Sequence, residues 1–161
     1  MKRFSIRDLI RAALMTAMVF LFTFVIRIPI PNGYVHLGDG AVMLCGFLLG
    51  PVLGPAAAIL GSVTADYFGG FAIYMLPTAI AKGLLSYLCA RAFWGEYNRK
   101  MQSAFIGAGA LASVAVYYMA EIIMYGNFVS PLINIPFNLL QTAVGIAAAA
   151  ILLKPLKVMS H

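Results

Sequence analysis

The sequence predicts an all-α integral membrane protein with six transmembrane helices in a single membrane domain, residues 1–161. Of its residues, 63% are hydrophobic and only 10% are charged, and the mean hydropathy is +0.94. These values lie far outside the averages of soluble proteins. The apolar residues also fall into blocks separated by glycine, proline and charged residues, as expected of helices that alternate with membrane-surface turns.

The first predicted helix covers residues 8–28. Basic residues precede an apolar run of about 18 residues without an Ala-x-Ala cleavage site, so we expect a retained helix rather than a signal peptide. Pro29 and Pro31 end this helix because proline cannot continue it. Residues 30–37 are expected to form an ordered loop of irregular backbone at the membrane face.

The second and third predicted helices, residues 39–49 and 52–68, are separated by a tight turn at Gly50-Pro51 and Gly54-Pro55. At a rise of about 1.5 Å per residue, the first of them spans only about half of a ~30 Å hydrocarbon core. One of its ends must therefore lie against protein. Three longer helices follow, at residues 71–93, 103–125 and 132–153.

Lysine and arginine predict the orientation of these helices. Nine of the eleven flank the N-terminus, the connection after the fourth helix and the C-terminus: Lys2, Arg3, Arg7, Arg11, Arg91, Arg99, Lys100, Lys154 and Lys157. With six spans these segments share one side, so we expect both termini to be cytoplasmic. The basic residues form no stripe with interleaved aromatic residues, and we expect no nucleic-acid partner.

Polar residues from four of the predicted helices converge at one depth, towards the outer face. They are Asp39, Asp66, Glu121, Asn134 and Asn138. Ionisable groups inside a membrane are costly and mark functional sites. We therefore predict a pocket that opens to the outside.

Three helix faces support this pocket, because residues four apart share a face. The faces carry Tyr74, Thr78 and Lys82; Tyr117, Tyr118, Glu121 and Tyr125; and Asn134, Asn138 and Gln141. Aromatic faces with a few donors and acceptors suit a flat polar heterocycle better than an inorganic ion.

Each of these residues also has a structural interpretation. Lys82 could form a structural ion pair with Asp66 or Asp39. The asparagines could join helices, and tyrosines are common in interfacial belts. The coincidence of all of them at one depth favours a site.

The segment Ala13-Leu14-Met15-Thr16-Ala17 places two small residues one turn apart, a pattern that allows another helix to approach closely. Two other features accompany this motif. They are the six predicted spans and the run from Tyr34-Val35-His36-Leu37-Gly38-Asp39 through Leu49-Gly50-Pro51 to Lys82-Gly83. Over nearly its whole length the chain resembles the S-component, the substrate-capturing membrane subunit, of an energy-coupling factor (ECF) vitamin transporter. The resemblance is to the riboflavin-type branch, which includes members assigned to hydroxymethylpyrimidine and to pyridoxine vitamers.

The resemblance implies a transport subunit in the plasma membrane of a bacterium, working with a transmembrane coupling subunit and two ATPase subunits. The chain has no phosphate-binding loop of its own. We therefore expect no enzymatic activity, no metal and no bound cofactor, with ATP used by the partner subunits. Ala13 and Ala17 would face the coupling subunit, and residues 34–37 would lie over the substrate. The residues expected to bind substrate are Tyr34, His36, Asp39, Asp66, Tyr74, Thr78, Lys82, Tyr118, Glu121, Asn134 and Asn138.

These residues offer more acceptors than cations, which favours a neutral or weakly cationic ring with hydroxyl or amino donors. Pyridoxine-type vitamers and hydroxymethylpyrimidine both fit, and we favour the vitamin B6 group slightly. The alternative is a stand-alone proton-coupled carrier with Asp66, Glu121 and Lys82 as a relay, although no inverted repeat supports it. An intramembrane enzyme would need a catalytic cluster that His36 and His161 cannot supply.

Overall fold

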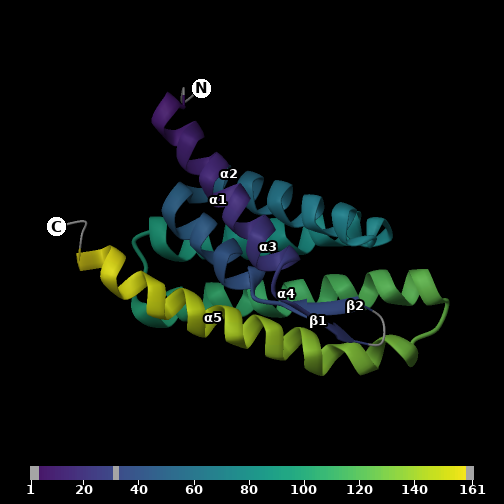
Figure 1. Ribbon diagram of the computed structural model, residues 1–161. Helices are drawn as coiled ribbons and strands as arrows, with labels where there is room; N and C mark the ends of the chain where they lie inside the picture. Colours follow the sequence, from purple (N-terminus) through teal and green to yellow (C-terminus); the bar gives the residue numbers. More distant parts are fainter. Residues whose placement is uncertain (1–3, 31–32, 159–161) are drawn as a thin grey trace.

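The computed structural model describes residues 4–30 and 33–158. These residues form five α-helices, one two-stranded hairpin and two short 3-10 helices, arranged as a single helical bundle (Figure 1). The start of α1 and the end of α5 lie on the left in Figure 1, opposite the connection between α4 and α5. The predicted turn at Pro31-Asn32, the basic residues Lys2 and Arg3, and His161 lie outside the described residues.

Helix α1, Ile6–Phe24, begins at a capping box. The Ser5 hydroxyl accepts the backbone N–H of Asp8 at 3.2 Å, and the Ser5 backbone N–H donates to the Asp8 carboxylate at 3.0 Å. Such reciprocal bonds satisfy donors that a helix start otherwise leaves unpaired. The helix ends four residues before the predicted limit at residue 28, because Arg27 and Ile28 belong to a strand.

Strands β1, Arg27–Ile30, and β2, Gly33–His36, pair in an antiparallel hairpin in which Arg27 lies opposite His36. The expectation of irregular backbone over residues 30–37 is therefore wrong for β2. The physical reason is that backbone N–H and C=O groups near a membrane need partners, and strand pairing supplies them.

Helix α2, Gly38–Gly69, consists of two helical segments that meet at Gly50, where φ is 78° and ψ is −172°. This conformation is open to glycine but strained for other residues. The chain folds back at this point, since a Cβ on Gly54 would lie 2.7 Å from the Cys45 carbonyl oxygen. The break coincides with the predicted turn at Gly50-Pro51.

The rest of the chain forms three more helices, each starting slightly away from its predicted limit. Helix α3, Met75–Trp94, follows the short helix η1, Ala72–Tyr74. Helix α4, Arg99–Tyr125, begins before residue 103 because the Asn98 side chain accepts the Met101 N–H at 2.9 Å and caps it. Helix α5, Ile135–Val158, follows η2, Ser130–Asn134.

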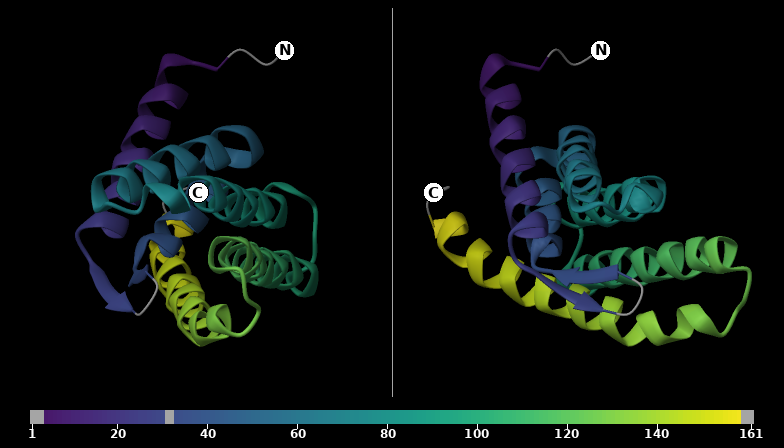
Figure 2. Two further views of the ribbon diagram at one scale, coloured as in Figure 1. Left: turned by 90° about the vertical axis from the view of Figure 1, so that its right-hand side faces the viewer. Right: turned by 45° about the vertical axis from the view of Figure 1, so that its right-hand side comes forward.

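Four helical stretches among the described residues are long and apolar enough to cross a membrane: Gly38–Gly69, Ala72–Trp94, Arg99–Tyr125 and Ser130–Leu153. The prediction of six transmembrane helices is thus not confirmed. Helix α1 carries Arg7, Asp8 and Arg11 in its first two turns, and these turns extend beyond the other helices (Figure 2). The first segment of α2 is too short to cross a membrane alone.

The core lies where α1, α2 and α3 meet, and it includes Val19, Val42, Ala58, Leu85 and Cys89. Helix α5 closes on this core at Gly145, where a Cβ would lie 2.7 Å from the Asp39 Cβ. This close approach brings polar side chains of α5 against the start of α2, which positions the site.

Candidate functional site

A cavity of about 50 Å³ lies beneath the hairpin, at the end of the bundle where α2 and α4 finish. We call it the hairpin cavity. It is lined by Tyr34, His36, Asp66, Phe71, Tyr74, Thr78, Tyr117, Glu121, Asn138 and Gln141. Its walls come from the hairpin, the end of α2, α3, α4 and α5.

The hairpin contributes Tyr34, whose hydroxyl donates to Asp66 Oδ1 at 2.6 Å. The Tyr34 ring lies beside the rings of Phe71 and His36, at centroid distances of 4.8 and 5.6 Å. Burial, reinforced by the Asp66 carboxylate, raises the pKa of Tyr34 above its usual value. The phenol therefore keeps its proton and remains a donor.

His36 anchors the base of the hairpin through two hydrogen bonds. Its backbone N–H donates to Gln141 Oε1 at 3.0 Å, and its Nδ1 accepts the Gly38 N–H at 2.9 Å. Burial first, and then the positive charge of Lys82, lower the pKa of His36 to about 4. The ring is neutral, and an Nδ1 that accepts places its proton on Nε2.

Glu121 of α4 forms the opposite wall and is buried. Both of its carboxylate oxygens lie 3.0 Å from Asn134 Nδ2, and Oε1 also lies 3.4 Å from the Tyr74 hydroxyl. The Tyr74 and Tyr125 hydroxyls are 2.6 Å apart. The Glu121 carboxylate thus has protein donors on both oxygens.

Asp66 is less completely satisfied than Glu121. Its Oδ1 accepts from Tyr34, whereas its buried Oδ2 has no hydrogen-bond partner among the described residues. Buried polar atoms are nearly always paired, and an exception calls for an explanation such as an absent ligand or water. This oxygen belongs to a residue that lines the hairpin cavity.

Lys82 forms a buried ion pair with Asp39, with Nζ 2.6 Å from Oδ1 and side-chain exposures of 1% and 0%. Gln141 Nε2 and Thr142 Oγ1 each lie 3.2 Å from the second Asp39 oxygen. The sequence left open whether Lys82 pairs with Asp66 or Asp39, and the geometry selects Asp39. Gln141 connects this pair to the hairpin through His36.

The structure brings together seven of the eleven residues expected to bind substrate: Tyr34, His36, Asp66, Tyr74, Thr78, Glu121 and Asn138. The other four do not line the cavity. Asp39 and Lys82 neutralise each other beside it, and Asn134 bonds to Glu121. The Tyr118 hydroxyl donates to the Phe128 carbonyl oxygen at 3.1 Å, which directs it to the connection after α4.

Three lining residues were not among the expected ones: Phe71, Tyr117 and Gln141. Tyr117 belonged to the predicted face of Tyr118, Glu121 and Tyr125, and helical spacing does not distinguish the two tyrosines because residues three and four apart share a face. The Tyr117 hydroxyl lies 3.0 Å from Thr78 Oγ1. Gln141 belonged to a predicted polar face, whereas nothing in the sequence distinguished Phe71 from other membrane aromatic residues.

A helical membrane protein with a polar, aromatic-lined cavity under a hairpin is suited to bind a small molecule. Residues 3–158 match the family model described as "ECF-type riboflavin transporter, S component". The chain belongs to this family. Such S components are substrate-binding transport subunits rather than enzymes, and they work with a coupling subunit and ATPases.

Two further proteins are similar to this chain. An uncharacterized protein of Pyrococcus woesei is 31% identical over 112 residues, covering 67% of this chain and 74% of that protein. A solved structure described as the S component of a bacterial ECF transporter superposes with a TM-score of 0.73 at 18% identity. That match covers 96% of this chain and 98% of the other, and it shows a shared fold.

Proposed function

We propose that this S component captures a small water-soluble vitamin or vitamin precursor, of the pyridoxine or hydroxymethylpyrimidine type, in the hairpin cavity. The coupling subunit and two ATPases then drive its delivery inward, and the chain itself binds no cofactor. The observation that carries this proposal is a cavity lined by five aromatic rings, counting the His36 imidazole, together with carboxylates and amides. Such a lining offers stacking faces and directed hydrogen bonds to a flat polar ring.

The size of the cavity supports a small ring. Its volume of about 50 Å³ is well below the roughly 300 to 1,000 Å³ of typical small-molecule sites. The family description names riboflavin, whose three fused rings and ribityl chain need far more space than a single ring. A single-ring vitamin therefore requires a smaller expansion of the cavity than riboflavin does.

Any of these ligands requires the hairpin to move, and the hairpin is the proposed gate. Two side-chain hydrogen bonds hold it down, from Tyr34 to Asp66 and from His36 to Gln141. Tyr34 and Asp66 both line the cavity, so the hydrogen bond between them must break or be replaced when a ligand enters. Ligand donors that take over the Asp66 oxygens would offset this loss.

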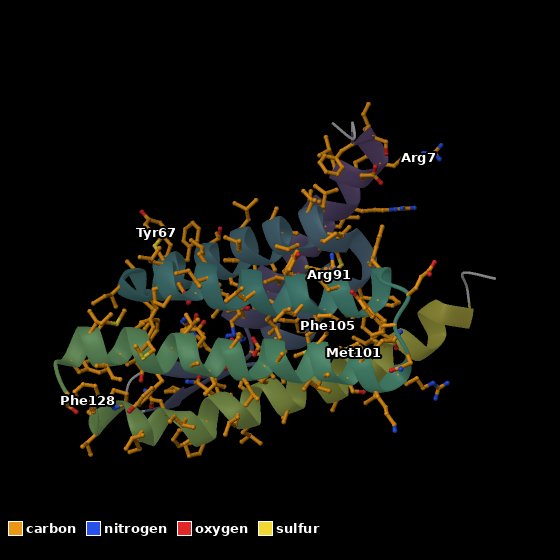
Figure 3. The ribbon with its side chains drawn as sticks, turned by 180° about the vertical axis from the view of Figure 1, so that it is seen from behind. Arg7, Tyr67, Arg91, Met101, Phe105 and Phe128 are labelled. Atoms are coloured by element: carbon orange, nitrogen blue, oxygen red, sulfur yellow. The ribbon has the colours of Figure 1, made fainter. Side chains whose placement is uncertain are left out.

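We propose that both termini face the cytoplasm and that the hairpin opens to the outside. The basic residues support this orientation, because Arg7 and Arg91 lie at the opposite end of the bundle from Tyr67 and Phe128 (Figure 3). Arg99 and Lys100 start α4 at that same basic end. Positive charge marks the cytoplasmic side. If a cysteine substituted for Asn98 were labelled from outside intact cells, this orientation would be contradicted.

The proton-coupled carrier receives less support from the geometry. That hypothesis needs Asp66, Glu121 and Lys82 to exchange a proton. Lys82 instead donates to Asp39, and Glu121 accepts from Asn134. No hydrogen bond among the described residues links the three groups directly.

Calorimetry on the purified subunit tests the proposed substrate class. We expect pyridoxine or hydroxymethylpyrimidine to bind and their phosphate esters to fail, because phosphate adds about 1.5 to 2 negative charges opposite Asp66 and Glu121. Asn138→Ala should weaken binding by about 1 to 3 kcal/mol if its amide bonds the ligand. The matched control is Thr64→Ala, since the Thr64 hydroxyl donates to the Leu60 carbonyl of its own helix and Thr64 does not line the cavity. A phosphate ester that binds as tightly as the free vitamer would refute the proposal.

A further inference from the structure

We propose that the hairpin cavity selects a cationic ligand, a heteroaromatic ring whose protonated amine donates to Asp66. This inference rests on the proposed function and assigns the charge state of the substrate. It also assigns Asp66 as the residue that discriminates a charged amine from a neutral hydroxyl.

The charges of the cavity lining are the first step. Asp66 and Glu121 line the cavity, and no lysine or arginine among the described residues does. Lys82 is occupied by Asp39 and is 1% exposed. Arg27 is exposed and lies over the Phe24 and Tyr34 rings, at 4.8 and 5.8 Å. Its guanidinium lies beside Gly69 rather than in the cavity lining. Within the described part of the chain, the cavity lining therefore has two carboxylates and no cationic side chain.

The second step compares the hydrogen-bond partners of the two cavity carboxylates. Glu121 already accepts from Asn134 on both oxygens and from Tyr74 on one. Asp66 accepts from Tyr34 on one oxygen, and its buried Oδ2 has no partner among the described residues. A ligand N–H group would satisfy this oxygen, and a cationic donor would also neutralise the carboxylate.

The surroundings of Asp66 favour positive charge in two more ways. Asp66 lies in the last turn of α2, which has no basic residue of its own, and Arg27 of β1 lies beside Gly69 in this turn. The carbonyl end of a helix carries partial negative charge and stabilises cations nearby. The rings of Tyr34 and Phe71 lie 4.8 Å apart beside it, and aromatic faces attract cations.

The experiment compares pyridoxamine with pyridoxine, which share one ring and differ by an aminomethyl in place of a hydroxymethyl group. Calorimetry on the purified full-length chain near neutral pH should show pyridoxamine binding roughly tenfold or more tightly, the gain expected for a hydrogen bond between charged groups. Asp66→Asn should abolish this difference. Glu121→Gln is the matched control, because it removes the other cavity carboxylate and should preserve the preference.

The outcomes separate this inference from the proposed function. Equal binding of the two rings, or tighter binding of pyridoxine, would overturn the inference and leave vitamin capture intact. A preference that survives in Asp66→Asn would overturn the role of Asp66. If riboflavin alone binds, or if no ring binds, the proposed substrate class fails and the inference fails with it. The comparison of pyridoxamine with pyridoxine uses the native chain, so it tests the inference even if a variant does not fold.

Discussion

The ion pair between Lys82 and Asp39 is the most buried charged contact among the described residues, and it sets a clear expectation for stability. Removing one member of a buried pair leaves an uncompensated charge, which costs about 3 to 5 kcal/mol. We therefore expect Lys82→Met to destabilise the subunit by about this amount in thermal or denaturant unfolding. Lys100→Met, at an exposed position of α4, is the matched control.

The double variant Lys82→Met with Asp39→Asn should recover much of this loss. An asparagine carries no charge and can still bond to Gln141 and Thr142, which both reach the Asp39 carboxylate. A single Lys82→Met variant as stable as the native chain would show that the pair does not hold the bundle together.

The lowered pKa of His36 leads to a prediction of how the stability of the subunit depends on pH. The pKa of His36 is lowered from 6.5 to about 4 in the folded chain, so the unfolded chain binds a proton first as pH falls. The contribution of neutral His36 is full above about pH 6.5 and is lost progressively towards pH 4. The physical cause is burial of the ring, which disfavours its charged form, reinforced by the positive charge of Lys82.

Unfolding curves between pH 7 and pH 5 measure this effect. His36→Asn offers an acceptor without a titrating ring, and its unfolding midpoint should depend less on pH. A native chain and a variant with identical pH profiles would contradict the role of His36.

For individual residues, the sequence indicated which ones are polar at membrane depth but not which of them pair with one another. Asp39 and Asp66 were equivalent candidates for Lys82, and the packing of α3 against α2 brings Lys82 to Asp39. Tyr117 and Tyr118 are adjacent but point about 100° apart around α4, so the rotation of this helix about its axis decides which one lines the cavity. Such rotations depend on packing between helices that are far apart in sequence.

Helix α1 carries the proposed surface for the coupling subunit. Ala13 and Ala17 are exposed, whereas Met15 and Val19 are buried against the bundle. Small side chains let a partner helix approach closely. Replacing either alanine with tryptophan should block complex assembly and uptake while the isolated subunit keeps its ligand affinity.

Co-purification with the coupling subunit and calorimetry on the isolated variant measure these two effects. Leu14→Trp is the matched control, because Leu14 is exposed and outside the Ala13 and Ala17 pair. Normal transport by both alanine variants would exclude this surface as the docking site.

The hairpin and the break in α2 show what sequence patterns resolve at the scale of elements. Glycine before proline at Gly50-Pro51 indicated a break, and Gly50 has the positive φ that such a break uses. The prolines Pro29 and Pro31 indicated only that helix α1 must end. Strand pairing of Arg27 with His36 depends on partners across a turn, and local propensity did not predict it.

The proposed capture function rests on three features of the whole molecule. The hairpin cavity lies at one end of the bundle, the basic residues lie at the other (Figure 3), and the small-residue face of α1 lies along the side. Composition predicted a helical membrane protein, and the orientation that the charge distribution indicates stays a prediction. The position of the cavity required the folding back of α2 and the packing of α4 and α5 beside α3.

The most direct test of this account is the identity of the small molecule that copurifies with the chain in the absence of its partners. Mass spectrometry of the denatured, purified subunit should reveal one small heteroaromatic vitamin or precursor, without phosphate, in stoichiometric amount. The same preparation of Asn138→Ala should release much less of it, because Asn138 lines the cavity. A phosphorylated or non-aromatic molecule, or equal release from both preparations, would contradict the account.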